Sequence, residues 1–169
     1  GSLVDVSSDV CSSDLPLDDG GGGARLLHKW TVLFSIRTTG RAAFLSVGWP
    51  GMAGAQTAIN EHGLALGNLT SYAGQVTPLG VPPGFIYRQM ADGASTRGEA
   101  SAILRSASRA MGNNLVVSSG REASPALFGF LPDAVDELPP GNGIRAYTNP
   151  LQTRKGPRQY APNAPLLRV

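Results

Sequence analysis

Two β-rich runs joined by a short turn constrain the fold more than any other feature of this chain. Residues 29–37 (KWTVLFSIR) and 42–49 (AAFLSVGW) are rich in aromatic and β-branched residues, which is typical of strands. The segment 38–40 (TTG) between them favours a hairpin turn. A second pair, residues 55–60 and 64–70, is separated by a Glu-His-Gly turn. Because parallel strands need a crossover of about a dozen residues or more, these pairs predict an antiparallel sheet.

Two helices are predicted after these strands. Residues 84–92 follow two prolines that suit a helix start, and an Asp-Gly pair suits the end of that helix. Thr96 and Glu99 form a capping box for the next helix, whose apolar residues recur at the i, i+3, i+4, i+7 spacing of one buried face. Strands followed by helices and then more strands indicate a layered α+β domain. The later strands are predicted at residues 114–119, 126–131 and 144–148.

The first 24 residues differ in composition from the rest of the chain. They hold five aspartates and no lysine or arginine, and residues 2–15 (SLVDVSSDVCSSDL) resemble translated sequencing-adapter sequence. Such a segment has little apolar surface to offset its ordering entropy, so we expect residues 1–24 to be disordered and exclude them from the fold. Residues 25–152 then form one domain, and residues 153–169 form a basic, proline-rich connection.

Composition excludes several classes of function. The chain carries a formal charge of +2, but its basic residues are scattered singly apart from Arg154, Lys155 and Arg158 and do not interleave with aromatic residues. We therefore expect no nucleic-acid binding. No apolar run approaches the roughly 18 residues that a membrane span needs. A single cysteine excludes an internal disulfide, and with only two histidines we expect no metal and no cofactor.

Four short motifs follow one another along the chain. They are Pro50-Gly51, residues 58–64 (AINEHGL), residues 80–82 (GVP) at a helix start, and residues 148–150 (TNP) near the end. In this order they resemble the penicillin acyltransferase (isopenicillin N acyltransferase) family, which is related to bile-salt hydrolases and penicillin V acylases. The resemblance covers about residues 26–152. Two departures are a proline in place of the histidine of the family's Thr-Asn-His and the lack of a glutamate often present in the strand around residue 128.

The resemblance implies an N-terminal-nucleophile hydrolase fold, a four-layer αββα sandwich of the α+β class, present here as an incomplete part. It also implies that a cysteine freed by self-cleavage attacks the amide carbonyl of a small-molecule amide or acyl substrate, with its own α-amino group as base. By position, Asn149 and Asn68 would donate to the oxyanion, and one such donor is typically worth about 2.7–4 kcal/mol. Arg88 is either a surface ion-pair former or a ligand for a substrate carboxylate.

Plainer interpretations stand beside these roles. An asparagine before a proline commonly forms a turn, which is the alternative for Asn149. We expect the Asn60 side chain to form the turn that follows it, and His62 to be exposed in that turn. Cys11 lies neither at a processed N-terminus nor in a setting that lowers its pKa, so it is not the expected nucleophile. Ser118 and Ser119 lack a G-x-S-x-G setting, which argues against a serine hydrolase.

Two functions from different classes therefore remain open. In the first, the chain is a fragment of an amide hydrolase or acyltransferase whose nucleophile is encoded upstream, so we expect the chain alone to be inactive. The second is a non-catalytic relative that binds small ligands or packs in an assembly. An unpaired sheet edge would also favour association of copies into a homo-oligomer.

Overall fold

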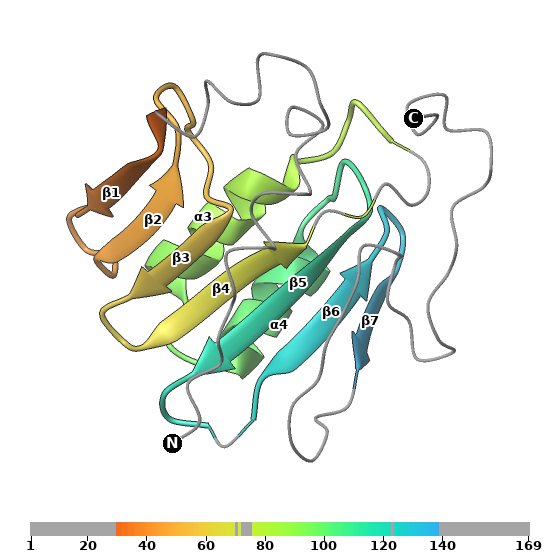
Figure 1. Ribbon diagram of the computed structural model, residues 1–169. Coiled ribbons are helices and arrows are strands. Elements are labelled where there is room, and N and C mark those ends of the chain that lie inside the picture. The colour runs from red at the N-terminus through yellow and green to blue at the C-terminus, as the bar shows by residue number, and fades with distance from the viewer. Residues whose placement is uncertain (1–29, 70, 72–75, 123, 139–169) are drawn as a thin grey trace.

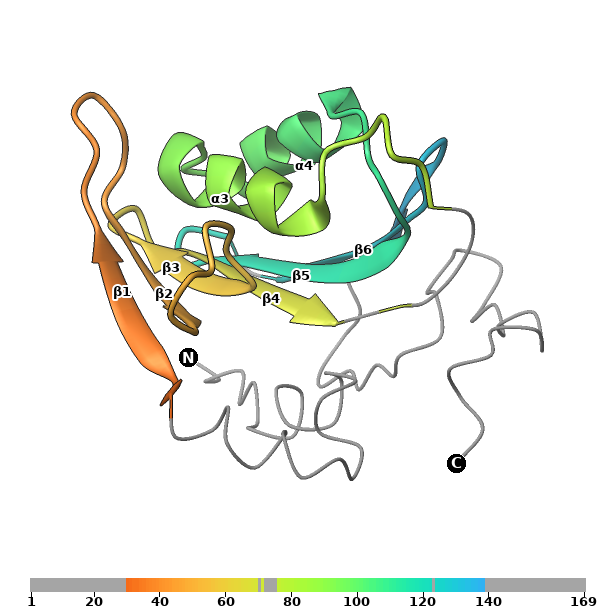
Figure 2. The same cartoon turned by 90° about the horizontal axis from the view of Figure 1, so that it is seen from above.

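A single antiparallel sheet with two helices on one face organises the protein (Figures 1 and 2). The structure, a computed structural model, describes residues 30–69, 71, 76–122 and 124–138. The seven strands of this part of the chain follow one another across the sheet in chain order, and each is antiparallel to its neighbours. The strands and helices are β1 (Val32–Ile36), β2 (Phe44–Gly48), β3 (Thr57–Asn60), β4 (Leu64–Leu69), α3 (Pro83–Gly93), α4 (Arg97–Ser106), β5 (Asn113–Ser119), β6 (Ala126–Phe130) and β7 (Val135–Leu138).

Both predicted hairpins are confirmed. Strands β1 and β2 pair with Ile36 opposite Phe44, and Gly40 in their connection has a φ of 74°. Strands β3 and β4 turn at Gly63, whose φ is 78° and whose N–H donates to the Asn60 carbonyl at 2.9 Å. A positive φ is readily reached only by glycine, which explains why each turn contains one.

The core lies between the helices and one face of the sheet. Alternate residues of the central strands point toward the helices, because side chains of a strand alternate between its two faces. The predicted capping box of α4 is present, and Ala100 and Leu104 of its apolar stripe are buried. The larger buried side chains of the core are Phe44, Leu64, Leu66, Ile86, Tyr87, Met90, Leu104, Leu115, Val117, Phe128 and Phe130.

The structure adds a strand that the sequence pattern did not predict. Strand β7 pairs with β6, with Val135 opposite Phe130, although its sequence is Val-Asp-Glu-Leu and all four residues are half-buried. Acidic residues are depleted in strands, so neither alternation nor β-propensity marked this segment. The strand predicted at residues 144–148 and the segments 1–24 and 153–169 lie outside the described residues.

The sheet face turned away from the helices is apolar across β1 to β3. Leu33, Leu45, Val47 and Ile59 alternate with helix-facing residues, and their side chains are exposed; Leu33 is 65% and Ile59 50% exposed. The described residues thus form one helical layer on one sheet layer, with helices covering only one face of that sheet (Figure 2). Association of copies through β1 stays a prediction.

Candidate active site

A polar cluster lies where β4 ends and β5 begins, with Asn68 half-buried and its partners Tyr87 and Asn113 buried. Asn68 stands opposite Leu115 in the register of these two strands, so its side chain is on the face covered by the helices. Tyr87 of α3 packs against this end of the sheet, and its ring meets that of Phe130 edge-on at 6.5 Å between centroids. Three elements that are far apart in sequence therefore place amide and hydroxyl groups together.

The hydrogen bonds of this cluster converge on one oxygen. Asn68 Oδ1 accepts from Asn113 Nδ2 at 2.7 Å and from the Tyr87 hydroxyl at 3.2 Å. Asn113 Oδ1 in turn accepts from two main-chain N–H groups, those of Ser71 at 2.8 Å and Asn114 at 3.0 Å. The Asn68 amide is therefore held at its oxygen end.

Burial sets the protonation state of the tyrosine. Tyr87 is fully buried, and desolvation raises the pKa of its hydroxyl well above the ordinary value because the charged phenolate is disfavoured in a low-dielectric interior. A hydrogen bond with Asn113 acts in the opposite direction and is the smaller effect. The hydroxyl therefore keeps its proton at neutral pH and can donate to Asn68 Oδ1.

Asn60 lies at the other end of the β3–β4 hairpin and has a structural role. Its Oδ1 accepts from the N–H groups of His62 and Leu64 at 3.1 and 3.0 Å, which confirms the predicted turn. Its Nδ2 also donates to the carbonyls of Ala91 at 3.0 Å and Ala94 at 2.6 Å, at the C-terminal end of α3. One side chain thus joins the hairpin turn to the helix above it, which the sequence did not predict.

Arg88 contacts the loop between β2 and β3. Its Nη1 donates to the Ala53 carbonyl at 2.7 Å, and this loop is already joined to α3 by the bond from Ala55 N to Gly84 O at 2.8 Å. The guanidinium thus helps to hold the helix on the loop. Its predicted alternative role, binding a substrate carboxylate, stays a prediction.

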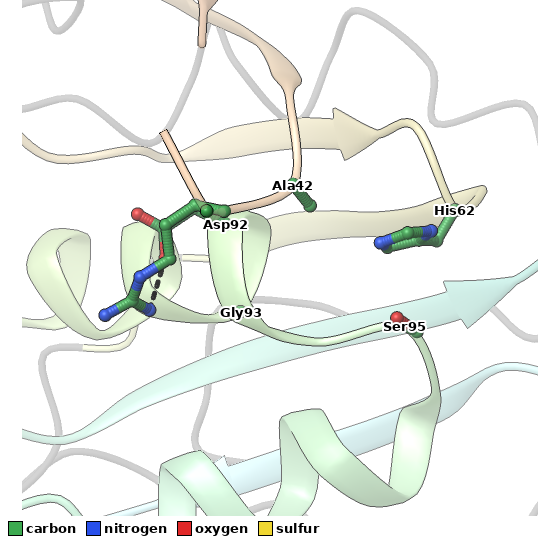
Figure 3. Close-up of a pocket in the computed structure, with 7 residues that line it drawn as sticks. Ala42, His62, Asp92, Gly93 and Ser95 are labelled. Atoms are coloured by element: carbon green, nitrogen blue, oxygen red, sulfur yellow. Dashed lines mark hydrogen bonds and ion pairs between the residues drawn. The ribbon is translucent and has the colours of Figure 1, made fainter. Parts of the chain in front are cut away.

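A hollow of about 370 Å³ lies at the opposite end of the strands from Asn68 (Figure 3). Arg41 and Asp92 form an ion pair of 3.3 Å in its wall, and the half-buried His62 of the β3–β4 turn points toward the same space as Ser95. This hollow is open and polar, and among the described residues no hydrogen bond joins the Ser95 hydroxyl to the His62 imidazole. It is therefore not the candidate active site.

Some of the predicted features lie outside the residues that the structure describes. Asn149, the motif at residues 148–150 and Cys11 lie outside the described residues. Among the residues that are described, no three His, Cys, Asp or Glu side chains gather as a metal site would require. A search of the same residues for helices long and apolar enough to span a membrane found none.

The sheet with its helical layer has the fold of an N-terminal-nucleophile hydrolase. A solved structure with this fold, the Caenorhabditis elegans N-acylethanolamine-hydrolyzing acid amidase (NAAA) ortholog, superposes with a TM-score of 0.52 at 14% sequence identity. The match covers 68% of this chain and 53% of that chain, so the present sequence spans about half the length of the similar protein. At this identity the likeness concerns the fold alone.

The family follows from the sequence match. The model of the acyl-coenzyme A:6-aminopenicillanic acid acyl-transferase family matches residues 23–131, and this chain belongs to that family. The resemblance seen in the motifs is confirmed at this level, although the matched residues end before the Thr-Asn-Pro motif. A comparison with curated proteins found no match.

The sequence patterns did not single out Tyr87, Asn113 or Ser71. One sequence signal for this cluster was the Asn-Asn pair at the start of β5. Asparagine is disfavoured in strands, so two in succession indicate that their side chains have specific hydrogen-bond partners. The predicted strand began one residue later, at 114, and so left Asn113 outside it. Tyr87 carried no signal, since a tyrosine on the apolar face of a helix is ordinary.

Proposed function

We propose that the protein containing this chain is a cysteine-type amide hydrolase or acyltransferase that acts on a linear amide of a small molecule. The match of residues 23–131 to an acyltransferase family carries this proposal. The similar nematode protein is named for hydrolysing N-acylethanolamines, which are linear amides, and this supports the substrate class.

The reaction divides one difficult step into two. A cysteine thiolate attacks the amide carbonyl carbon, the carbonyl oxygen becomes an oxyanion, and the C–N bond then breaks as the amine leaves with a proton. The thioester that remains is attacked by water in hydrolysis or by a second amine in transfer. Donors must be fixed where the negative charge develops, and we propose Asn68 and Asn149 for this task.

Cys11 is not the nucleophile in this proposal. It is the one cysteine of the 169 residues, and it lies outside the residues that match the family. A segment of the protein beyond this sequence would supply the attacking thiol, and the chain itself would be inactive. The described part of the chain would then contribute the sheet, the helices and one oxyanion donor.

The test compares this chain with a longer protein expressed from the same gene with its upstream coding sequence. Each is incubated with an N-acylethanolamine and with an acyl thioester, and intact mass and released amine are followed. We expect turnover and an acyl adduct in the longer protein only, and Cys11→Ser in that protein should leave both unchanged.

Each contrary result has a distinct meaning. An acyl adduct on Cys11 would refute the assignment of the nucleophile. A longer protein that binds the amide without adduct or turnover would favour the non-catalytic ligand-binding alternative.

A further inference from the structure

The orientation of the Asn68 amide decides what this residue can do. A side-chain amide has a donor end, Nδ2, and an acceptor end, Oδ1, and only the donor end stabilises an oxyanion. Rotation by half a turn exchanges the two ends at almost no change in shape. A residue that fixes this rotation therefore controls the chemistry of Asn68 without touching the substrate.

The main chain determines the orientation of Asn113. The N–H groups of Ser71 and Asn114 donate to one end of the Asn113 amide, and a main-chain N–H cannot act as an acceptor. That end must therefore be Oδ1. The other end of Asn113 must be its NH₂ group, and this group faces Asn68 at 2.7 Å.

The same logic extends to Asn68. Because Asn113 presents a donor, the end of Asn68 that faces it must be the acceptor, Oδ1. The Tyr87 hydroxyl donates to the same oxygen at 3.2 Å, which occupies its two lone-pair directions. The Nδ2 end is then turned away from the cluster, toward the opposite side of the Asn68 side chain.

Burial makes this orientation costly to reverse. Asn68 is half-buried, but its two donors are buried, with Asn113 6% and Tyr87 0% exposed, so water replaces a lost acceptor poorly at their end. A flipped Asn68 would set its NH₂ group against that of Asn113, and the Asn113 NH₂ group would lose its acceptor Oδ1.

We infer that Asn113 is a positioning residue. Two main-chain N–H groups fix the orientation of its amide, and its NH₂ group in turn fixes the orientation of Asn68, whose N–H end then faces the reaction site. Tyr87 supports the same orientation from the helix. The catalytic role of Asn68 rests on the proposed function, whereas the orientation of its amide does not.

Asn113→Asp is the decisive variant. An aspartate keeps the acceptors for the two main-chain N–H groups but presents an oxygen to Asn68, which must then turn its NH₂ group inward. In the longer, active protein we expect kcat to fall by about a hundred- to a thousandfold, the loss typical of one oxyanion donor, with little change in KM. Tyr87→Phe leaves the Asn113 donor in place, so it should lower kcat by less than about tenfold.

The double variant separates positioning from added charge. If Asn113 acts through Asn68, the variant Asn68→Ala with Asn113→Asp should be no slower than Asn68→Ala alone. An aspartate that acts by its own charge, or by general loosening of the fold, would slow the reaction equally with and without Asn68. Multiplying effects would therefore overturn the inference.

Two measurements on the present chain need no activity. With ¹⁵N-labelled asparagine, the Asn68 side-chain NH₂ signal, identified by its loss in Asn68→Ala, should move downfield in Asn113→Asp because it now donates to a carboxylate. Asn68→Asp keeps both acceptor roles and Asn68→Leu keeps neither, so Asn68→Asp should melt at the higher temperature of the two.

The outcomes distinguish the two proposals. An NH₂ signal that does not move, or an Asn68→Asp chain as unstable as Asn68→Leu, refutes the orientation. If Asn113→Asp fails to fold, the comparison of Asn68→Asp with Asn68→Leu still decides. If both measurements agree with the orientation but the longer protein has no amidase activity, the proposed function fails and the positioning of Asn68 stands.

Discussion

Replacing Asn60 by alanine tests the role of one buried polar side chain that joins the β3–β4 turn to α3. Asn60 is 5% exposed, and its amide makes four hydrogen bonds that join the β3–β4 turn to the end of α3. A side chain that only formed the turn would cost about 1 kcal/mol when removed. The two added bonds to helix carbonyls predict a larger effect.

The magnitude follows from the partners. Each hydrogen bond contributes about 0.5–1.5 kcal/mol net, so four bonds bound the loss at about 2–6 kcal/mol. The His62 N–H regains water more easily than the helix carbonyls do, because His62 is half-buried whereas Ala91 and Ala94 are buried. We therefore expect Asn60→Ala to lose about 3 kcal/mol, which lowers Tm by about 10 °C in a domain of this size.

Urea denaturation followed by circular dichroism measures this loss, and Asn60→Asp is the matched control. Aspartate keeps the acceptor for the turn, but it places a carboxylate oxygen against the Ala91 and Ala94 carbonyl oxygens in place of the Asn60 NH₂ group. Its ionised form is disfavoured in the folded state, so stability should be greater at acidic pH and fall as pH rises toward neutral. A loss near 1 kcal/mol in Asn60→Ala, with no pH dependence in Asn60→Asp, would refute the bridging role.

Three further substitutions have defined expectations. Thr96→Ala removes the capping box with Glu99 and should cost about 1 kcal/mol in denaturation, whereas Thr96→Ser should cost little. Gly80→Ala should lower the free energy of unfolding by about 1–3 kcal/mol, because its Cβ would collide with main-chain atoms of Arg109 and Ala110. Gly98→Ala is the control: its Cβ would lie 3.9 Å from the nearest atom, so it should be neutral or stabilising in the same assay. Arg109→Met removes a buried guanidinium that donates to five carbonyls and joins α4 to the segment after β6. A loss of unfolding free energy below about 1 kcal/mol would contradict that role.

Local features of the chain were predictable because their causes are local. The turns around Gly40 and Gly63 follow from the glycine conformation, and the capping box at Thr96 follows from a spacing of three residues. Hairpins and helices of this kind form from neighbours in sequence, so composition and periodicity sufficed for them. The family motif at residues 58–64 likewise lies within one hairpin.

Tertiary structure alone decided what the polar residues do. Asn68, Tyr87 and Asn113 come from β4, α3 and β5. Only the assembled sheet and helix bring the Tyr87 hydroxyl and Asn113 Nδ2 to 3.2 and 2.7 Å from Asn68 Oδ1. Strand β7 depends in the same way on its neighbour, since a tetrapeptide with two acidic residues at its centre becomes a strand when β6 offers its free edge. Sequence by itself determined the two hairpins and the two helices, because those preferences act between near neighbours. The partner of each buried amide is a property of the assembled layers, because its energy depends on atoms 19 to 45 residues away.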